Sequence, residues 1–341
     1  MSTTELNALE FKNVGKVYKL PHGGKVEALK SFSLSIPKGE FFGLLGHNGA
    51  GKTTAINILA GVNKPTTGDI LVHGNSVVND PEMTKRIVGV VQQELLVDSF
   101  FKLPTMLKIQ SKLYGVVPDL EWINLLLEKL KLKEHYKKTT RELSGGMKRR
   151  MMIARALVHK PRVLILDEPT AGVDVQLRHS MWEFIKELHE TGITIILTTH
   201  YLEEAENFCT RIGIMKNGEL VTLKKNKDLL SLGGEPKFNF VLKFSSNLGS
   251  NSSEKMLADI KESFHFKDAQ IEFVSELSHN DEKKIKISSH MSYQNLEYVN
   301  LYIEKIKELA EAKNLTIESF YTEQPSLEEV FLKINNGNIV S

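Results

Sequence analysis

Residues 43–54, GLLGHNGAGKTT, have the composition of a loop that binds a polyphosphate. Gly46, Gly51, Lys52 and Thr53 fit the pattern G-x-x-x-x-G-K-[ST], in which bare glycines let backbone N–H groups converge on an anion. A helix that begins near Lys52 adds its positive end, Lys52 can neutralise the β- and γ-phosphates, and Thr53 can coordinate Mg²⁺. Because an apolar run precedes the loop and a helical stretch follows it, the segment predicts a nucleoside triphosphate site.

Two acidic residues follow a second apolar run, VLIL at 163–166. A buried strand there would deliver Asp167 and Glu168 to its carboxyl end, which is where ligands bind in open α/β sheets. Asp167 would hold Mg²⁺, and the Glu168 carboxylate would orient an attacking water and act as general base. The plainer interpretation is a solvated strand end, but the phosphate loop in the same chain favours the catalytic one.

His200 and Gln93 each follow a further apolar run. His200 ends TIILTTH and is either a packed or capping residue or a contact to the γ-phosphate or the attacking water. Gln93 lies in VGVVQQE, where a neutral amide could bridge Mg²⁺ and the water. Gln92 is its neighbour, and spacing alone does not choose between the two.

The segment LSGGM offers a second anion site without a second lysine. Ser144 is a good N-cap, and Gly145 and Gly146 leave the N–H groups of the helix start accessible. One answer is that these residues serve the nucleotide of a second copy, so that a two-fold dimer holds two ATP molecules. The alternative is an ordinary capped helix.

Composition limits the classes of function. A net charge of +2 over 341 residues does not indicate nucleic acid as the main partner, and Lys148, Arg149 and Arg150 are interpreted as a solvated helix face. The single cysteine, Cys209, is interpreted as a small core residue and suits a reducing compartment. No stretch of eighteen apolar residues predicts a membrane span, and the first residues do not resemble a signal peptide.

The elements that must position these residues follow from hydrophobic patterns. Residues 6–36 alternate apolar and polar side chains and predict an antiparallel sheet, whereas 41–46, 163–166 and 194–197 are almost wholly apolar, as in buried parallel strands. The pattern predicts helices at 52–60, 105–114, 119–131, 145–158 and 175–190. Strands alternating with helices indicate a layered α/β domain, and Asn217-Gly218 between apolar runs predicts a hairpin.

The character of the chain changes after about residue 225. Segments FNFVLKF, AQIEFV and KKIKIS predict strands, SSNLGSNSSEK is a polar loop, and Leu296, Val299, Ile303, Ile306 and Ala310 share one face of a predicted helix. A last helix begins at PSLEEVFL, with a capping box in which Ser326 reaches Glu329. We therefore expect a small α+β domain in the tail.

In this order, the motifs resemble those of the nucleotide-binding subunit of ABC transporters. GHNGAGKTT is similar to the Walker A loop, LSGGM to the signature motif, VLILDE to Walker B, AGVD to the D-loop and TTH to the H-loop. The family pattern GxVxQE matches residues 89–94 and selects Gln93 over Gln92. The resemblance covers about residues 8–225.

Two departures place the chain within a subgroup of that family. Met147 stands where the wider family favours Gln, and Ala171-Gly172-Val173 where Ser-Ala-Leu is common. Both occur among ATPase subunits of multidrug-type exporters, which SGGMKRR, EPTAGVD, THYLEEAE and PSLEEVFL also resemble. Such subunits pair with a separately encoded permease.

The resemblance implies a set of functional residues. Catalysis would rest on Glu168, His200, Gln93 and Lys52, and the Mg²⁺ ligands would be Thr53, Gln93 and Asp167. Tyr18, in KVYKL, stands where the family places an aromatic ring that stacks on adenine. The residues expected to bind the nucleotide are Tyr18, Gly46, His47, Asn48, Gly49, Ala50, Gly51, Lys52, Thr53, Thr54, Ser144, Gly145, Gly146 and Asp174.

The implied fold is a P-loop NTPase (RecA-like) core, with an N-terminal antiparallel β-subdomain and an α-helical subdomain at about 94–160. We expect this nucleotide-binding domain at 1–231 and a small α+β accessory domain at 232–341. Phe100, Phe101 and Leu103 either contact a permease or pack in the core, whereas Leu113 and Tyr114 are expected to be core residues.

The resemblance also implies partners and location: a homodimer with ATP sandwiched between its subunits, an integral-membrane permease, no nucleic acid, and a peripheral position on the cytoplasmic face of the plasma (inner) membrane. The expected cargo is drugs, lipids or other hydrophobic compounds.

Three other functions compete with the transport ATPase. A soluble ABC ATPase of DNA repair or ribosomes generally carries two nucleotide domains or a long coiled coil, and this chain has one phosphate loop and no sustained heptads. A P-loop kinase would leave LSGG and His200 without roles. A scaffold that does not hydrolyse ATP is disfavoured by Glu168.

Overall fold

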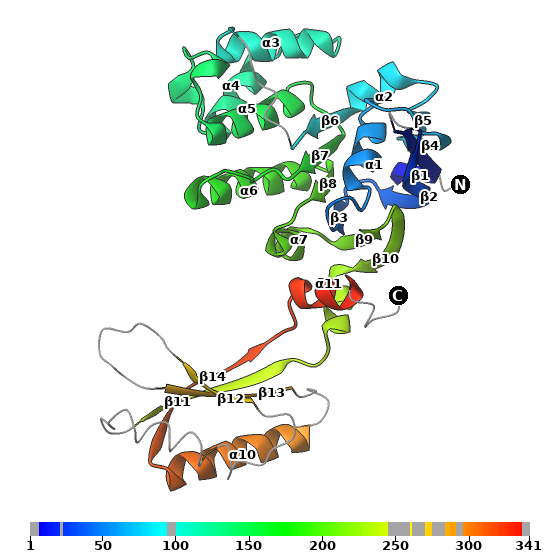
Figure 1. Ribbon diagram of the computed structural model, residues 1–341. Helices are drawn as coiled ribbons and strands as arrows, with labels where there is room; N and C mark the ends of the chain where they lie inside the picture. Colours follow the sequence, from blue (N-terminus) through cyan, green and yellow to red (C-terminus); the bar gives the residue numbers. More distant parts are fainter. Residues whose placement is uncertain are drawn as a thin grey trace. The chain divides into compact units, whose positions relative to one another are not determined.

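The computed structural model describes residues 7–20, 23–93, 100–244, 260, 270–274, 284–290 and 296–335. The chain divides into two compact units between Asn226 and Lys227, and Figure 1 shows the elements of both. The boundary expected at 231/232 stays a prediction, and the polar loop SSNLGSNSSEK lies outside the described residues. Among the described residues, no helix combines the length and apolar character needed to cross a bilayer.

A six-stranded sheet in the order β10-β9-β3-β8-β7-β6 forms the centre of the first unit. Its five strands from β9 to β6 run parallel, and β10 is antiparallel at one edge. β7 and β8 are buried along their whole length, as expected from their continuous apolar sequences. The strands are β3 (Phe41–Gly46), β6 (Val88–Val91), β7 (Val163–Asp167), β8 (Thr194–Thr198), β9 (Arg211–Lys216) and β10 (Glu219–Lys225).

The predicted hairpin joins β9 to β10. Asn217 and Gly218 both have positive φ, 50° and 82°, as the two-residue turns that match strand twist require. The Gly218 N–H donates to the Ala50 carbonyl at 2.9 Å, and the Lys30 N–H donates to the Gly218 carbonyl at 3.0 Å. The hairpin turn is therefore fastened to the phosphate loop.

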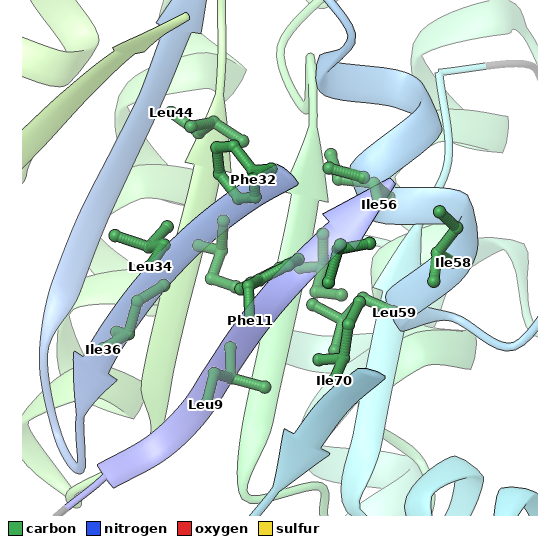
Figure 2. Close-up of a cluster of buried hydrophobic side chains, with 14 of the residues drawn as sticks. Leu9, Phe11, Phe32, Leu34, Ile36, Leu44, Ile56, Ile58, Leu59 and Ile70 are labelled. Carbon is green, nitrogen blue, oxygen red and sulfur yellow. The ribbon is translucent and has the colours of Figure 1, made fainter. Parts of the chain in front are cut away.

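A second, antiparallel sheet in the order β2-β1-β4-β5 packs over α1 and the central sheet. The apolar residues of β1 and β2 meet those of α1 in one buried cluster (Figure 2), where Phe11 and Phe32 pack edge to face with ring centroids 5.1 Å apart. This core fixes the helix that follows the phosphate loop. The elements are β1 (Asn7–Lys19), β2 (Lys25–Pro37), α1 (Lys52–Leu59), β4 (Thr67–Val72) and β5 (Asn75–Ser76).

Helices form the remainder of the first unit. In Figure 1, α3, α4 and α5 lie together beyond the β6 edge of the central sheet. The helices are α2 (Pro81–Ile87), α3 (Leu103–Leu113), α4 (Leu120–Lys129), α5 (Gly145–Leu157), α6 (Val175–Glu190), α7 (Leu202–Phe208) and the short 3₁₀ helices η2 (Lys133–His135) and η3 (Thr140–Glu142).

The helical layer corrects one expectation about its apolar residues. Leu113 was expected in the core but is 76% exposed, because it lies on the outward side of the last turn of α3. Phe100 and Phe101 are exposed and Leu103 is fully buried. The sequence could not separate these residues because all are apolar and adjacent to one helix.

The second unit contains a four-stranded antiparallel sheet in the order β12-β13-β11-β14. The predicted face of α10 packs against this sheet: Val299, Ile306 and Ala310 are buried, together with Tyr302, whose ring contacts Phe240. Its elements are α8 (Asn226–Leu230), which spans the division between the units, η4 (Ser231–Gly233), β11 (Lys237–Phe244), β12 (Gln270–Val274), β13 (Lys284–His290), α10 (Leu296–Ala312), β14 (Leu315–Glu323) and α11 (Leu327–Asn335).

Half of the predicted capping box is present at the start of α11. The Glu329 N–H donates to Ser326 Oγ at 3.2 Å. Lys333 Nζ, one turn further on, donates to the Gly233 carbonyl of η4. The first bond caps the helix, and the second holds α11 against η4 at the start of its own unit.

Candidate active site

The phosphate loop joins the end of β3 to α1, as the sequence predicted. Gly51 immediately precedes α1 with a φ of 106°, and a Cβ on it would lie 2.6 Å from the Ala28 carbonyl oxygen. A Cβ on Gly46 would lie 2.6 Å from the Met215 carbonyl oxygen. The loop therefore needs glycine at Gly51 because of its positive φ, and at both positions because a Cβ would clash with a backbone carbonyl.

Lys52 folds back over the loop. Its Nζ donates to the carbonyls of Gly46 at 2.6 Å and His47 at 3.2 Å. Burial lowers the pKa of Lys52, while the nearby carboxylates of Asp167 and Glu168 act to raise it. The ammonium group is thus held beside the loop, where an anionic ligand would replace its carbonyl partners.

The carboxyl ends of β7 and β8 bring the acidic pair next to the loop. Thr198 Oγ1 donates to Asp167 Oδ1, and the Glu168 N–H donates to the Thr198 carbonyl at 2.9 Å. Burial is the main cause of the raised pKa of Asp167. Glu168 has a φ of 50°, an uncommon left-handed conformation for a non-glycine residue that marks the sharp turn after β7.

Two of the predicted catalytic side chains converge on the carboxylate of a third, Glu168. Gln93 Nε2 donates to Glu168 Oε2 at 2.8 Å, and His200 Nδ1 lies 3.2 Å from Glu168 Oε1. These residues follow β6, β7 and β8, three neighbouring strands, so the topology alone brings their ends together. The Glu168 carboxylate, which would accept a proton, is therefore held in position from both sides.

A cavity of about 500 Å³ opens over this cluster. Its walls include the loop and the strand ends: Asn48, Gly49, Ala50, Gly51, Lys52, Thr53, Thr54, Gln93, Asp167 and Glu168. Val26, Glu27 and Lys30 of β2 and Asn217 of the β9–β10 turn complete the lining, together with Ala28. The sequence did not indicate these residues, because their contribution depends on how β2 and the hairpin pack against the loop.

The lining includes the oxygen atoms that a hard divalent cation prefers. Thr53 supplies a hydroxyl, and Asp167 has a second carboxylate oxygen besides the one bonded to Thr198. Gln93 donates through its amide nitrogen, so its amide oxygen is directed elsewhere. This set fits Mg²⁺, which typically takes one or two carboxylates, with phosphates and waters as its other ligands.

Other predicted residues lie outside the lining of this cavity. Ser144 is exposed and caps α5, its Oγ accepting from the Met147 N–H at 3.4 Å. Asp174 is exposed and caps α6 by accepting from the Leu177 N–H at 3.1 Å. A Cβ on Gly146 would lie 3.5 Å from the Gly172 carbonyl, so the two caps belong to neighbouring loops.

Tyr18 is also absent from the lining. The Tyr18 ring is half-buried, with Lys16 Nζ 5.0 Å from its centroid, and its hydroxyl accepts from Asn63 at 3.2 Å. Its stacking on adenine remains a prediction.

The interpretation of Arg149 and Arg150 as solvated is wrong. Their side chains are 1% and 5% exposed. Arg149 reaches the backbone of the site, whereas Arg150 Nη1 donates to the carbonyls of Leu130 and Lys131 at the end of α4, at 2.7 and 3.0 Å. A basic run on a helix does not reveal which of its members point inward.

Glu204 is a second residue that the sequence did not single out. It is buried at the start of α7, where its carboxylate accepts from Thr170 Oγ1, from Thr199 Oγ1 at 2.8 Å and from Trp182 Nε1 at 3.3 Å. Thr199 precedes His200, and Thr170 follows the acidic pair at the end of β7. Glu204 therefore connects the segments that follow β7 and β8 at the site.

A phosphate loop at the end of β3 and an acidic pair at the end of β7 define a P-loop nucleoside triphosphatase. Gln93 after β6 and His200 after β8 both contact Glu168, the second acidic residue. This arrangement indicates the subclass of these enzymes in which water accepts the transferred phosphoryl group.

Comparison with known proteins supports this class of enzyme. Residues 29–171 match the family described as ABC transporter. The linearmycin resistance ATP-binding protein LnrL of Bacillus subtilis is 35% identical over 97% of this chain and 99% of its own length. The Nod factor export ATP-binding protein I of Cupriavidus metallidurans is 37% identical over 65% of this chain and 72% of its own.

Solved structures show the same fold. The dimeric bacterial ABC transporter cassette MJ0796 covers 64% of this chain and 98% of its own, with 29% identity and a TM-score of 0.59. The same cassette in a post-hydrolysis state bound to ADP and phosphate gives 28% identity and a TM-score of 0.59.

The chain belongs to the family of ABC transporter ATP-binding proteins. It is an ATP-binding and ATP-hydrolysing subunit of the exporter type, and its P-loop NTPase fold is the one that the sequence predicted.

Proposed function

We propose that two copies of this chain close around two ATP molecules and that hydrolysis opens them again. The observation that carries the proposal is the convergence of Gln93 and His200 on Glu168, beside the phosphate loop. Ser144 and Asp174 support the dimer, because they form exposed caps outside their own chain's cavity. A facing subunit would bring the Ser144 hydroxyl and the N–H groups of Gly145 and Gly146 to the γ-phosphate.

The chemistry is positioning and electrostatics. Glu168 accepts a proton from a water aligned with the γ-phosphate, and Gln93 and His200 hold that carboxylate and the water in place. Lys52 leaves the carbonyls of Gly46 and His47 and donates to the β- and γ-phosphates. Its positive charge then stabilises the negative charge that develops on the transferred phosphoryl group.

Thr53, Asp167 and the Gln93 amide oxygen would hold Mg²⁺. When bound, the ion neutralises phosphate charge. Asp167 then stays ionised despite its raised pKa, because a cation beside it offsets the cost of burial.

A membrane-embedded permease is the proposed partner. A groove of about 730 Å³ lies between α2, the end of α3 and α5, and reaches Gln92 next to the catalytic glutamine. Its walls combine apolar residues with one acidic residue, Glu82, and four basic ones, Lys85, Arg86, Lys112 and Arg155. A permease segment seated there would move with Gln93, so dimer closure at the cytoplasmic face of the membrane would be transmitted to the transport pathway.

The proposed cargo is a drug, lipid or other hydrophobic compound moved outward. The support is the function for which similar proteins are named: linearmycin resistance for one that matches 97% of this chain, and Nod factor export for another. The soluble ABC ATPase remains the alternative, and co-purification of the chain with a membrane protein separates the two.

The Glu168→Gln variant tests the chemistry. Gln keeps the size and hydrogen-bonding capacity of the side chain but cannot accept the proton, so we expect kcat for ATP hydrolysis to fall at least about 100-fold. ATP binding should persist, and dimers should accumulate in size-exclusion chromatography with Mg²⁺-ATP. Glu190→Gln, an exposed change at the end of α6, is the control and should behave as wild type. Unchanged turnover in Glu168→Gln would refute the assignment of the base.

A further inference from the structure

Arg149 has a contact pattern that the proposed mechanism does not use. Its guanidinium has five N–H bonds, and the structure gives them five main-chain carbonyl acceptors. Nε donates to Pro169 at 3.0 Å, Nη1 to Gln92 and to Gln93 (3.1 Å for the latter), and Nη2 to Asp167 and Glu168. The acceptors are two consecutive residues after β6 and three consecutive residues from the end of β7.

These two segments carry the reacting geometry. The side chains of Gln93 and Glu168 are hydrogen-bonded to each other at 2.8 Å, and the carbonyls of the same two residues bind one guanidinium. Arg149 therefore fixes the distance between two backbone segments whose side chains must align a water. β6 and β7 are paired along their strands, but this pairing ends at Val91 and Leu166, before the site.

The side chain that binds these two segments comes from a third element, α5. Arg149 belongs to α5, the helix that Ser144 caps, and it is 1% exposed. None of the five hydrogen-bond acceptors is a carboxylate, so carbonyl dipoles bind the guanidinium directly, and the nearby carboxylates of Asp167 and Glu168 add an attraction between charges. Dipoles are effective only at fixed geometry, and a buried charge without partners is costly. A shift of α5 must therefore carry the two segments with it or break these bonds.

We propose that Arg149 is a positioning residue that sets Gln93 against Glu168 and couples their alignment to the place of α5. This inference rests on the proposed function, in which Ser144 at the start of α5 meets the ATP of the facing subunit. Engagement of Ser144 by that nucleotide then orders the base and glutamine of its own chain, five residues along the same helix. Each site thereby reports its occupancy to the other.

Arg150 shows what a merely structural arginine on this helix does. It is equally buried but points to the end of α4, where its Nη1 binds two carbonyls. None of its acceptors belongs to the site. Arg150→Lys is therefore the matched control for Arg149→Lys: the same substitution, on the same helix, with similar burial.

The test compares nucleotide binding with turnover in wild type, Arg149→Lys and Arg150→Lys. Lysine keeps the charge but has three donors on one atom, so it cannot span the carbonyls of two segments. We expect Arg149→Lys to lower kcat by roughly 100-fold, because small misplacements of reacting groups cost about this much. Its Kd for a fluorescent ATP analogue should stay within about twofold of wild type, since the phosphate loop is untouched. The Hill coefficient for ATP should fall toward 1.

Arg150→Lys should keep the wild-type kcat and Hill coefficient. Urea denaturation of both variants removes stability as an explanation. The proposal is overturned if Arg149→Lys retains wild-type kcat, or if both variants lose kcat equally at equal loss of stability. Failure of the proposed dimer is recognised separately, because Glu168→Gln would then form no ATP-dependent dimer, while the kcat comparison still decides the role of Arg149.

Discussion

At the scale of single residues, the Glu168 carboxylate organises the site, because Gln93 and His200 contact it from the ends of two other strands. Lys52, Asp167, Glu168 and Gln93 all line one cavity. Arg149 was missed because a run of three basic residues on a helix looks the same whether it faces water or protein. Its burial depends on carbonyls from two distant strand ends, which are visible only after folding.

Glu204 offers a residue-scale prediction. Glu204→Ala leaves Thr170, Thr199 and Trp182 without their shared acceptor in a buried place, so we expect a loss of about 3 kcal/mol in the free energy of unfolding. Glu204→Gln keeps one acceptor oxygen and should lose only about 1 kcal/mol. Urea denaturation measures both, and equal losses in the two variants would contradict the role of the carboxylate.

At the scale of elements, strands with continuous or alternating apolar residues could be predicted, whereas β14 could not. β7 and β8 are buried throughout and were expected. β14 was not, because LTIESFYTE is exposed after its first residue and gives no apolar run. Its strand character comes from pairing with β11, a contact between residues about eighty positions apart. The order of the strands, which brings the site together, likewise depends on such pairings.

His159 links three elements and predicts a dependence of stability on pH. It follows α5, its ring stacks on Tyr114 at the end of α3 with centroids 3.7 Å apart, and its Nε2 bonds to the Val88 carbonyl of β6. Burial lowers the pKa of His159 from 6.5 to about 4. Below pH 6.5, His159 is protonated in the unfolded chain but stays neutral in the folded chain. The free energy of unfolding therefore falls as the pH drops toward 4.

We expect this histidine to remove about 2 kcal/mol of the free energy of unfolding between pH 7.5 and pH 5. His159→Gln retains an amide donor for the Val88 carbonyl but does not titrate. The measurement is urea denaturation of both proteins at the two pH values. If the variant loses as much stability as wild type, His159 is not responsible.

At the scale of the whole molecule, the division of the chain suggests that the tail acts on the dimer. Residues 227–340 form a compact unit with its own sheet and buried cluster. We expect that a chain ending at residue 231 still hydrolyses ATP but forms a weaker dimer. Sedimentation of the truncated Glu168→Gln protein with Mg²⁺-ATP measures this, and an unchanged dimer constant would remove the proposed role of the tail.

The central claim is that Ser144 of one subunit completes the triphosphate site of the other. A mixing experiment in the Glu168→Gln background tests it: one chain adds Lys52→Ala, and the other adds Ser144→Asp, which keeps a good N-cap but places a negative charge against the phosphate. The measurement is the amount of radiolabelled ATP retained after gel filtration.

Neither chain alone should retain ATP, because both pockets of each homodimer carry a defect. An equimolar mixture should retain it, since a heterodimer joins an intact Lys52 to an intact Ser144 in one of its two pockets, or about a quarter of all pockets at random pairing. Retention by the mixture equal to the mean of the two separate proteins would contradict the shared site.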